Sequence, residues 1–428
     1  MNPSLDRDCF SNSEPLMPLE TALTLLRQRI HCVVGTEMLP LDAAQDRILA
    51  TDITAKFDIP GHDNAAVDGY AVYGEDLDPA GETKLPIAGR AAAGHPLRHG
   101  QPRGTAVRIF TGAAMPAGPD GTAGPDTVAM QEDCRAEGDA VLVGPGLKRG
   151  QNRRRRGEDV TAGRKILEAG TRLRPQEIGL AAAAGQARLA LRARLRVALF
   201  STGDELAEPD QPLAPGTIHD SNRYILGALL RQSGTSVNDL GILPDRPDAV
   251  RLALQVAARD HDLLLTSGGV STGEEDHVKA AIASMGRLHF WRLAIKPGRP
   301  VALGQIDAGG RAVPFVGLPG NPVAAMVTYL RIARPLILGL MGAKDLEPVR
   351  YRLPAAFALH KKRDRREFLR GWVETDAAGK QAVQRFEREG SGILTSMTTA
   401  TGLVEIAEDV TAVAPGDLVD FLPFSDLR

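Results

Sequence analysis

The sequence predicts a multidomain α/β protein built around a doubly wound parallel sheet. With 428 residues, the chain is too long for one compact hydrophobic core. From residue 196 onward, strand patterns alternate with helix patterns, and such alternation predicts parallel strands with helices on both faces of the sheet. Two other regions contain short apolar runs separated by Gly and Pro, which indicates β-rich modules. The hydrophobic fraction of 43% and the charged fraction of 24% are typical of a soluble globular protein.

Four domains are expected along the chain. Apolar residues at helical spacing in segments 19–30, 41–49 and 175–184 predict an elongated helical N-terminal and linker domain over residues 1–50 and 160–190. The β-rich module, residues 51–159, is expected to be inserted into it. The α/β domain is expected over residues 191–345, and short strands and turns predict a C-terminal, barrel-like β domain over residues 346–428.

Charge and cysteine content exclude several classes of protein. The formal net charge is −2, so neither nucleic acid nor a membrane surface is an expected partner. The acidic N-terminal segment has no apolar core like that of a signal peptide, and no apolar stretch is expected to approach bilayer-spanning length. Cys9, Cys32 and Cys134 are odd in number and widely spaced, which fits neither a disulfide framework nor a cysteine-based metal site. A cytoplasmic location is expected.

A glycine-rich turn follows the apolar strand predicted at residues 262–266. Ser267, Gly268 and Gly269 open this turn and Ser271 closes it, so bare backbone N–H groups are expected at a strand end, where they can bind phosphate. Taken alone, this turn is as readily explained as a tight structural turn. The acidic segment 273–276 follows immediately and leads into a helix, which favours the phosphate site.

Acidic side chains lie at two neighbouring strand ends. Asp276 alone reads as a helix cap. Together with Asp204 and Glu205 at the end of the first α/β strand, it indicates a shared Mg²⁺ site or an acid/base role.

Basic residues lie in two segments, a stiff Pro/Gly loop and a run of four arginines. Lys296 and Arg299 sit in a Pro/Gly loop that costs little entropy to order, and we interpret them as anion-binding rather than simply solvated. The turn from Pro319 to Pro322 has no titratable group and is expected to present backbone donors at a helix start. The run 153–156 of four arginines is equally well explained as a solvated loop or as a phosphate site.

Six motifs occur in order between Asp63 and Pro322, and together they closely resemble the MoeA and gephyrin E-domain family, the molybdopterin molybdenumtransferases. The resemblance runs from about Pro18 to the C-terminus. The motifs are Asp63-Asn-Ala-Ala-Val-Asp-Gly-Tyr-Ala71, Ile109-Phe-Thr-Gly112, Asn152-Arg-Arg-Arg-Arg-Gly-Glu-Asp159, Phe200-Ser-Thr-Gly-Asp-Glu205, Ser267-Gly-Gly-Val-Ser271 and Leu318-Pro-Gly-Asn-Pro322.

The resemblance implies that the central domain is molybdopterin-binding and that the chain forms an L-shaped homodimer. It also implies a reaction: molybdate is inserted into adenylylated molybdopterin, with Mg²⁺-dependent release of AMP. The active sites would lie at the subunit interface, with residues of the β module acting across the dimer. A molybdopterin adenylyltransferase and proteins that mature molybdoenzymes are the expected partners.

The family's functional residues carry over onto residues of this chain. The resemblance implies catalytic roles for Asp68, Asp159, Glu205, Asp245, Asp276 and Lys296, with Glu205, Asp245 and Asp276 near the metal. Substrate or phosphate binding is expected of Thr111, Ser267, Gly268, Gly269, Ser271, Arg292, Arg299, Pro319 and Pro322. Arg292 and Arg299 stand where relatives commonly have Lys, so charge is kept while the geometry of the cation changes.

Two other functions fit parts of the sequence. The region from residue 196 to about 340 also resembles molybdopterin adenylyltransferases, but such an enzyme needs no β module carrying Asp68 and Asp159. A scaffold role like that of gephyrin is the non-enzymatic alternative, although the acids of the site are intact.

Overall fold

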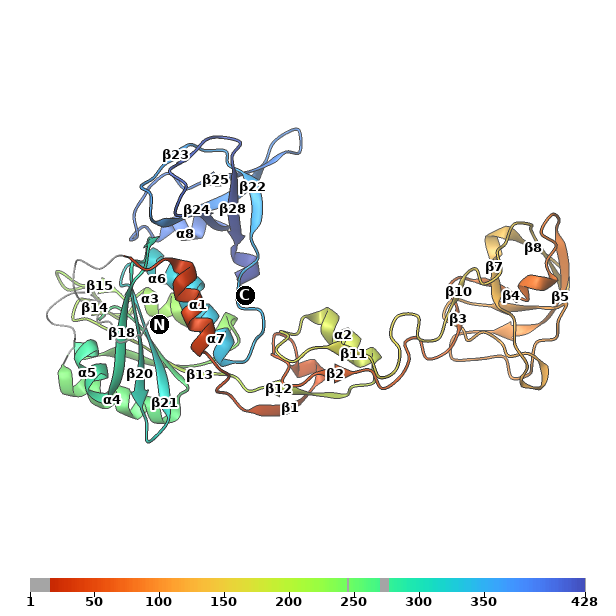
Figure 1. Cartoon of the computed structure of the whole chain (residues 1–428), viewed down its shortest axis with the longest axis horizontal. Coiled ribbons are helices and arrows are strands. Elements are labelled where there is room, and N and C mark those ends of the chain that lie inside the picture. Colours follow the sequence, from red (N-terminus) through yellow and green to blue (C-terminus); the bar gives the residue numbers. More distant parts are fainter. Residues whose placement is uncertain (1–15, 245, 270–276, 428) are drawn as a thin grey trace, which may run out of the picture.

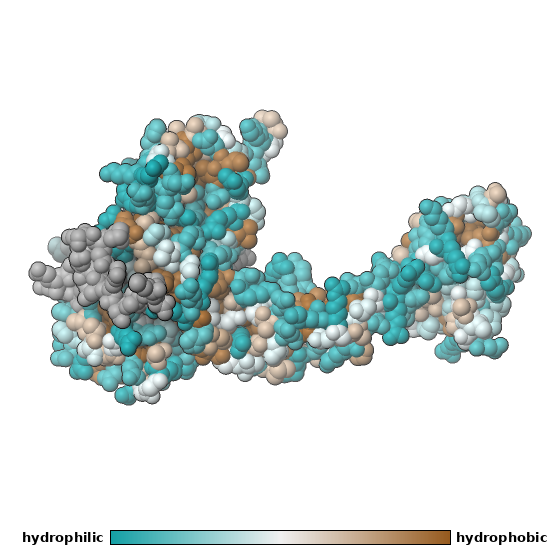
Figure 2. All heavy atoms as spheres, viewed as in Figure 1, coloured by the Kyte–Doolittle hydropathy of each residue, from teal (hydrophilic) through white to brown (hydrophobic). Residues whose placement is uncertain are grey.

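The computed structural model describes residues 16–244, 246–269 and 277–427 of an elongated molecule. The α/β domain and the C-terminal β domain lie together at one end of the long axis, and the β module lies at the other (Figure 1). A thin linker region joins the two ends. Hydrophilic residues cover most of the visible face of this linker (Figure 2).

The α/β domain contains a six-stranded sheet in the order β16-β13-β17-β21-β20-β18. Strands β16, β13, β17 and β21 are parallel, as the sequence predicts, but β20 runs antiparallel to both of its neighbours, so the expectation of a wholly parallel sheet was wrong. The bounds of the six strands are Ser236–Leu243 (β16), Arg196–Thr202 (β13), Leu263–Ser267 (β17), Ala312–Leu318 (β21), Pro300–Asp307 (β20) and Gly286–Arg292 (β18).

Helices cover both faces of this sheet, as expected for a doubly wound domain. Alternate strand residues point to opposite faces, so Val197 and Leu199 pack under one set of helices while Ala198 and Phe200 pack under the other. The first set is α1 (Leu19–Arg29), α3 (Asn222–Gln232), α6 (Pro322–Thr328) and α7 (Arg334–Leu340); the second is α4 (Pro247–Asp260) and α5 (His277–Met285).

The helices α6 and α7 join through a π-helical turn, Tyr329–Ala333, into one long apolar run. Among the described residues, Pro322–Leu340 alone is long and apolar enough to cross a bilayer, with 19 residues and a mean hydropathy of 1.5. The expectation that no stretch approaches this length was therefore wrong. However, 94% of its most apolar window is buried in the protein, which is the environment of a core helix.

The C-terminal domain is a curled sheet in the order β19-β24-β26-β28-β22, with β25 beside β24. A bridge between Ala355 and Val383 links the region after β22 to β25, which brings the sheet toward the expected barrel-like closure. The bounds are Ile295–Lys296 (β19), Arg366–Thr375 (β24), Gly402–Ile406 (β26), Leu418–Pro423 (β28), Tyr351–Pro354 (β22), Gln381–Arg385 (β25), Leu359–His360 (β23), Ala412–Val413 (β27) and Thr395–Thr399 (α8).

The linker region contains less helix than expected. Helix α2 (Pro175–Ala183) is present, but segment 41–49 forms only a 3₁₀ turn, Leu41–Ala43, because it is held by β-bridges from Ile48 and Leu49. Two antiparallel strand pairs complete the linker: β1 (Thr36–Pro40) with β12 (Arg188–Arg192), and β2 (Ile53–Thr54) with β11 (Lys165–Leu167). Helix α1 packs on the α/β sheet rather than on α2.

The β module folds around one sheet in the order β7-β4-β6-β5-β9-β8. Because the chain leaves the linker before this module and returns to it afterwards, the module is an insertion. The exact domain boundaries stay predictions. Its strands are Thr127–Met130 (β7), Gly69–Val72 (β4), Ala106–Ile109 (β6), Thr83–Ala91 (β5), Ala140–Val143 (β9) and Cys134–Glu137 (β8), with Asn64–Ala65 (β3) paired to Arg153–Arg154 (β10).

Candidate active site

A cleft of about 960 Å³ lies between the C-terminal ends of the parallel strands and the C-terminal β domain. Ligands of doubly wound domains bind in this position because the loops after the strands open there. Six residues predicted for the site line the cleft: Glu205, Gly268, Gly269, Lys296, Arg299 and Pro319. The structure therefore brings together segments that are more than 100 residues apart in the sequence.

The glycine-rich turn needs its glycines for two reasons. Gly268 and Gly269 have φ angles of 86° and 62°, in the left-handed region that side chains other than glycine rarely adopt. A Cβ atom on Gly269 would also overlap the side chain of Thr202 at the end of β13. The turn therefore presents backbone without side chains to the cleft, as a phosphate-binding turn requires.

Asn222, which the sequence analysis missed, joins the glycine-rich turn to the turn from Pro319 to Pro322. Its Nδ2 donates to Ser267 Oγ at 2.7 Å and to the Gly320 carbonyl at 2.6 Å. Ser267 in turn donates to the Pro319 carbonyl at 3.1 Å. Ser267 is buried, so its observed role is to hold the turn rather than to face the cleft. The sequence did contain a signal for this role, because Asn222 is a polar residue at the predicted start of a helix in the α/β region.

Glu205 extends from the loop after β13 and is exposed. A Cβ atom on Gly203, which has a φ of 140°, would overlap the Glu205 carboxylate, so Gly203 allows the side chain to fold back. Mg²⁺ is commonly held by one or two carboxylates together with waters and substrate phosphates, and Glu205 fits one such ligand.

The other two predicted metal ligands, Asp245 and Asp276, lie outside the described residues, as does Ser271. Within the part of the chain that the structure describes, no group of three His, Cys, Asp or Glu residues is close enough to hold a metal ion. The described carboxylates therefore supply only part of a metal site.

Lys296 lies on β19, which pairs in parallel with β24 of the C-terminal domain, rather than in a free loop. Its Nζ lies 2.9 Å from Glu389 and 3.4 Å from Glu367. The hydrogen bond and charge of Lys296 lower the pKa of Glu389 below its ordinary value. The predicted anion-binding cation is thus paired with carboxylates of the C-terminal domain.

Three guanidinium groups of the cleft form no ion pair with a carboxylate of the described residues. They belong to Arg299, Arg365 and Arg370. Arg370 is only 6% exposed, and its hydrogen bonds go to neutral groups, including Ser396 Oγ at 3.0 Å and the Arg388 carbonyl at 2.9 Å. Burial lowers the pKa of Arg370, and the charge of Glu389 opposes this shift without forming an ion pair. A buried cation held only by neutral hydrogen-bond partners favours the binding of an anion beside it.

Sequence reasoning missed the whole contribution of the C-terminal domain to the cleft, which includes Arg365, Glu367, Arg370, Glu389 and Ser391. Besides Ser267, two further predicted residues of the α/β domain do not line the cleft: Arg292 and Pro322. Arg292 ends β18, and its Nη1 is buried without a partner in the described part of the chain. Pro322 begins α6.

The remaining predicted residues lie on the β module. Thr111 donates to Asp68 Oδ1 from its backbone N at 2.8 Å and from its Oγ1 at 2.7 Å, and these bonds lower the pKa of Asp68. Asp159 is exposed. These three residues do not line the cleft of their own chain, because the β module lies at the far end of the molecule (Figure 1).

The arginine run of the β module is partly paired. Arg156 Nε donates to Asp58 at 2.6 Å, and Arg153 lies 3.6 Å from Asp63. For Arg154 and Arg155, no carboxylate partner lies among the described residues.

Comparison with known proteins agrees with this architecture. Residues 17–185 match the MoeA N-terminal region (domain I and II), residues 198–339 match a probable molybdopterin binding domain, and residues 352–424 match the MoeA C-terminal region (domain IV).

Named relatives cover nearly the whole chain. A molybdopterin molybdenumtransferase of Haemophilus influenzae is 37% identical over 96% of this chain and 100% of its own length. Molybdopterin molybdenumtransferase 2 of Mycobacterium tuberculosis is 37% identical over 88% of this chain and 92% of its own. The crystal structure of a molybdopterin biosynthesis moeA protein from Pyrococcus horikoshii OT3 superimposes with a TM-score of 0.79 at 28% identity, covering 96% and 100% of the two chains.

The three matched regions follow one another in the order of the predicted motifs, and full-length relatives exceed 30% identity. The resemblance inferred from the motifs is confirmed. The chain belongs to the MoeA family of molybdopterin molybdenumtransferases.

Proposed function

We propose that this protein is a molybdopterin molybdenumtransferase that inserts molybdate into adenylylated molybdopterin and releases AMP in a Mg²⁺-dependent step. The observation that carries this proposal is the cleft itself. The cleft joins a glycine-rich turn to three guanidinium groups that form no ion pair within the described residues. Two relatives that are 37% identical to this chain are named as molybdopterin molybdenumtransferases.

The two parts of the cleft suit two parts of the reaction. Phosphate oxygens of the adenylylated substrate would accept hydrogen bonds from backbone N–H groups at Gly268 and Gly269. Molybdate is a tetrahedral dianion, and Arg299, Arg365 and Arg370 would hold it by charge-assisted hydrogen bonds. Lys296 adds a cation once an anion competes with Glu389. When bound, Mg²⁺ would offset the negative charge of the phosphates near Glu205.

The site would be completed by a second copy of the chain. Asp68, Thr111 and Asp159 belong to the β module, and Figure 1 shows this module at the opposite end of the molecule from the domains that line the cleft. A homodimer in which the β module of one chain covers the cleft of the other would bring them to the substrate. The fixed Asp68 carboxylate would then be available to accept a hydrogen bond from the substrate.

The proposed setting is a cytoplasmic pathway. The adenylylated substrate would come from a molybdopterin adenylyltransferase, and the product would pass to proteins that mature molybdoenzymes.

The test is AMP release by the purified protein with adenylylated molybdopterin, Mg²⁺ and molybdate. We expect AMP release to require both Mg²⁺ and molybdate, and the product to activate an apo-molybdoenzyme. Arg370→Ala should raise the molybdate concentration needed for half-maximal release, whereas Arg352→Ala, at an exposed arginine on β22 of the same domain, should not. Turnover of ATP with free molybdopterin, without AMP release in the first assay, would instead identify an adenylyltransferase.

A further inference from the structure

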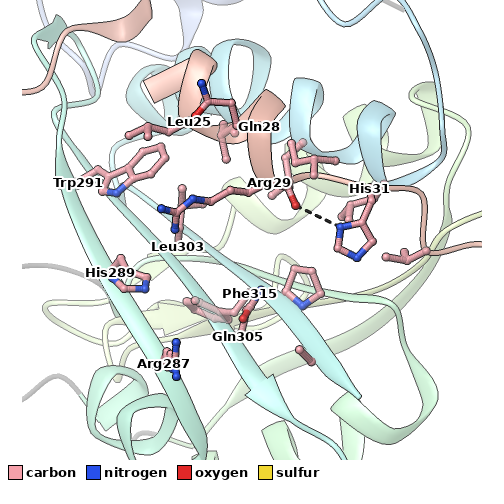
Figure 3. A pocket seen from close by; sticks show the side chains of 18 residues that line it. Leu25, Gln28, Arg29, His31, Arg287, His289, Trp291, Leu303, Gln305 and Phe315 are labelled. Atoms are coloured by element: carbon pink, nitrogen blue, oxygen red, sulfur yellow. Dashed lines mark hydrogen bonds between the residues drawn. The ribbon is translucent and has the colours of Figure 1, made fainter. Parts of the chain in front are cut away.

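A second cleft, of about 710 Å³, lies between α1 and the edge of the α/β sheet formed by β18, β20 and β21. It shares no lining residue with the candidate active site. Figure 3 shows Arg29 reaching from α1 across this cleft toward Trp291, with His289 and Arg287 further along β18. A volume in this range suits a small organic molecule.

The pleat of β18 places three chemically useful side chains on one face. Arg287, His289 and Trp291 are two residues apart along the strand, so they point to the same side of the sheet, toward α1. Leu288 packs into the core on the opposite face. The alternation of side chains along β18 therefore determines which residues form this wall of the cleft.

The cleft is positively charged and has no acidic lining. Of the 18 described residues that line it, none is Asp or Glu. The side chains of Arg29, Arg287 and His289 have no hydrogen-bond or carboxylate partner within the described residues. By contrast, Arg27 on the same helix forms an ion pair with Glu347. Unpaired cations around a concave site favour an anionic ligand.

The floor of the cleft is apolar and well packed. Trp291 is 5% exposed, Leu303 is 9% exposed and Phe315 is 1% exposed. These side chains supply flat and aliphatic surface, while the cations lie at the rim, where Arg29 and Arg287 are exposed. An apolar floor with a few charged groups at its edge is the usual arrangement of a small-molecule site.

We propose that this cleft binds a planar aromatic molecule that carries a negative charge, such as a carboxylate, sulfonate or phosphate. The ring would lie against Trp291 and Leu303, and the anionic group would face Arg29 and Arg287. This second site is independent of the proposed transferase reaction, because none of its residues contributes to the first cleft.

Binding of 8-anilinonaphthalene-1-sulfonate, an anion with a planar naphthalene ring, tests the proposal. The chain has two tryptophans, and Trp372→Phe leaves Trp291 as the only one. In this background, we expect saturable energy transfer from Trp291 to the bound probe. Arg29→Ala combined with Arg287→Ala should weaken binding about tenfold, the effect of roughly 1.4 kcal/mol expected for two partly exposed charged contacts. Arg29→Lys should restore part of the affinity.

Two controls separate charge recognition from general apolar binding. Arg251→Ala, at an exposed arginine on α4, should leave binding unchanged. The uncharged analogue N-phenyl-1-naphthylamine should bind the wild type and the double variant equally. Absence of energy transfer from Trp291, or equal affinity of the sulfonate for the wild type and the folded double variant, would overturn the proposal.

Discussion

Lys296 is the residue whose environment differs most from what its sequence context implies. It was expected to face an anion from a stiff Pro/Gly loop, yet it bonds to Glu389 and approaches the 3%-exposed Glu367. We predict that Lys296→Ala reduces the apparent affinity for molybdate about ten- to a hundredfold, because a charge-assisted contact contributes roughly 1.5–3 kcal/mol. The loss also leaves the negative charge of Glu367 facing the anion. Molybdate titration of AMP release measures the effect.

The matched control for this variant is Lys344→Ala. Lys344 is 43% exposed and pairs with Glu168 at 3.1 Å, whereas Lys296 is 41% exposed, so both substitutions remove a paired, half-exposed lysine. Only Lys296→Ala should change the molybdate dependence. Glu389→Gln should leave molybdate affinity equal or higher, since it frees Lys296. If Lys296→Ala binds molybdate normally, the lysine serves to dock the C-terminal domain.

Asp68 allows a prediction about pH. Hydrogen bonds from Thr111 lower the pKa of Asp68 below the ordinary value of 3.8, with the backbone N–H as the largest cause and the hydroxyl next. Thr111→Val removes the hydroxyl but keeps the N–H, so we predict that the pKa of Asp68 rises partway toward 3.8. Carboxyl ¹³C NMR titration measures it, and Thr105→Val, whose hydroxyl bonds to the Pro102 carbonyl, is the control.

The sign of the stability change follows from this shift. A carboxyl group with a lowered pKa stabilises the fold above its unfolded pKa and loses that contribution as the pH falls through the folded value. Thr111→Val should therefore be less stable than wild type above about pH 4. The difference should shrink in more acidic solution. A stability gap that grows on acidification would contradict the assignment.

At the scale of elements, the two turns of the active site are held together by the start of α3. We predict that Asn222→Ala, which removes the bonds to Ser267 and Gly320, lowers the free energy of unfolding by about 1–3 kcal/mol. It should also weaken binding of the adenylylated substrate more than it slows turnover at saturation, because we propose that these turns bind the phosphates of the substrate. Urea unfolding and the KM and kcat of AMP release give these values.

Asn238→Ala is the control for this element. Asn238 Nδ2 lies 3.1 Å from His261 Nε2 in the same domain but away from the cleft. It should cost stability while leaving KM unchanged. If both asparagine variants alter KM alike, the effect reflects general destabilisation of the domain.

The elements that sequence reasoning placed correctly are those whose pattern is local. Strands β13, β16 and β17 are continuous apolar or alternating runs, and their helices have clear starts such as Pro247. Strand β20 was missed because Pro300 and Gly304 interrupt its pattern and it follows a Pro/Gly loop. Segment 41–49 has helical spacing, but pairing with distant residues overrides the propensity of so short a segment.

The candidate site was predictable only where it follows strand ends. Glu205, Gly268 and Gly269 could be found because carboxyl ends of parallel strands converge. Arg370 and Glu389 could not, because they reach the cleft through the pairing of β19 with β24, which joins residues about 70 positions apart. No local pattern reports such a contact.

At the scale of the whole molecule, the predicted functional residues fall into two groups at opposite ends. One group surrounds the cleft, and the other, with Asp68 and Thr111, lies on the β module beyond the linker (Figure 1). If both groups act on one substrate, as we propose, a single chain of this shape would leave each site incomplete. A symmetric dimer in which the chains run in opposite directions would form two composite sites.

We predict that mixing Asp68→Ala protein with Glu205→Ala protein restores activity that neither variant has alone. After random exchange of subunits, half of the dimers are mixed and each contains one intact site, so about a quarter of wild-type AMP release should return. The control is a mixture of Asp68→Ala with Asp159→Ala. Both of these substitutions lie on the β module, so every site in their mixed dimer keeps one damaged module and no activity should return. Failure of the first mixture, despite subunit exchange confirmed by mass spectrometry, would show that the sites are not shared between chains. Recovery in the second mixture would show that Asp68 and Asp159 do not act in the same site.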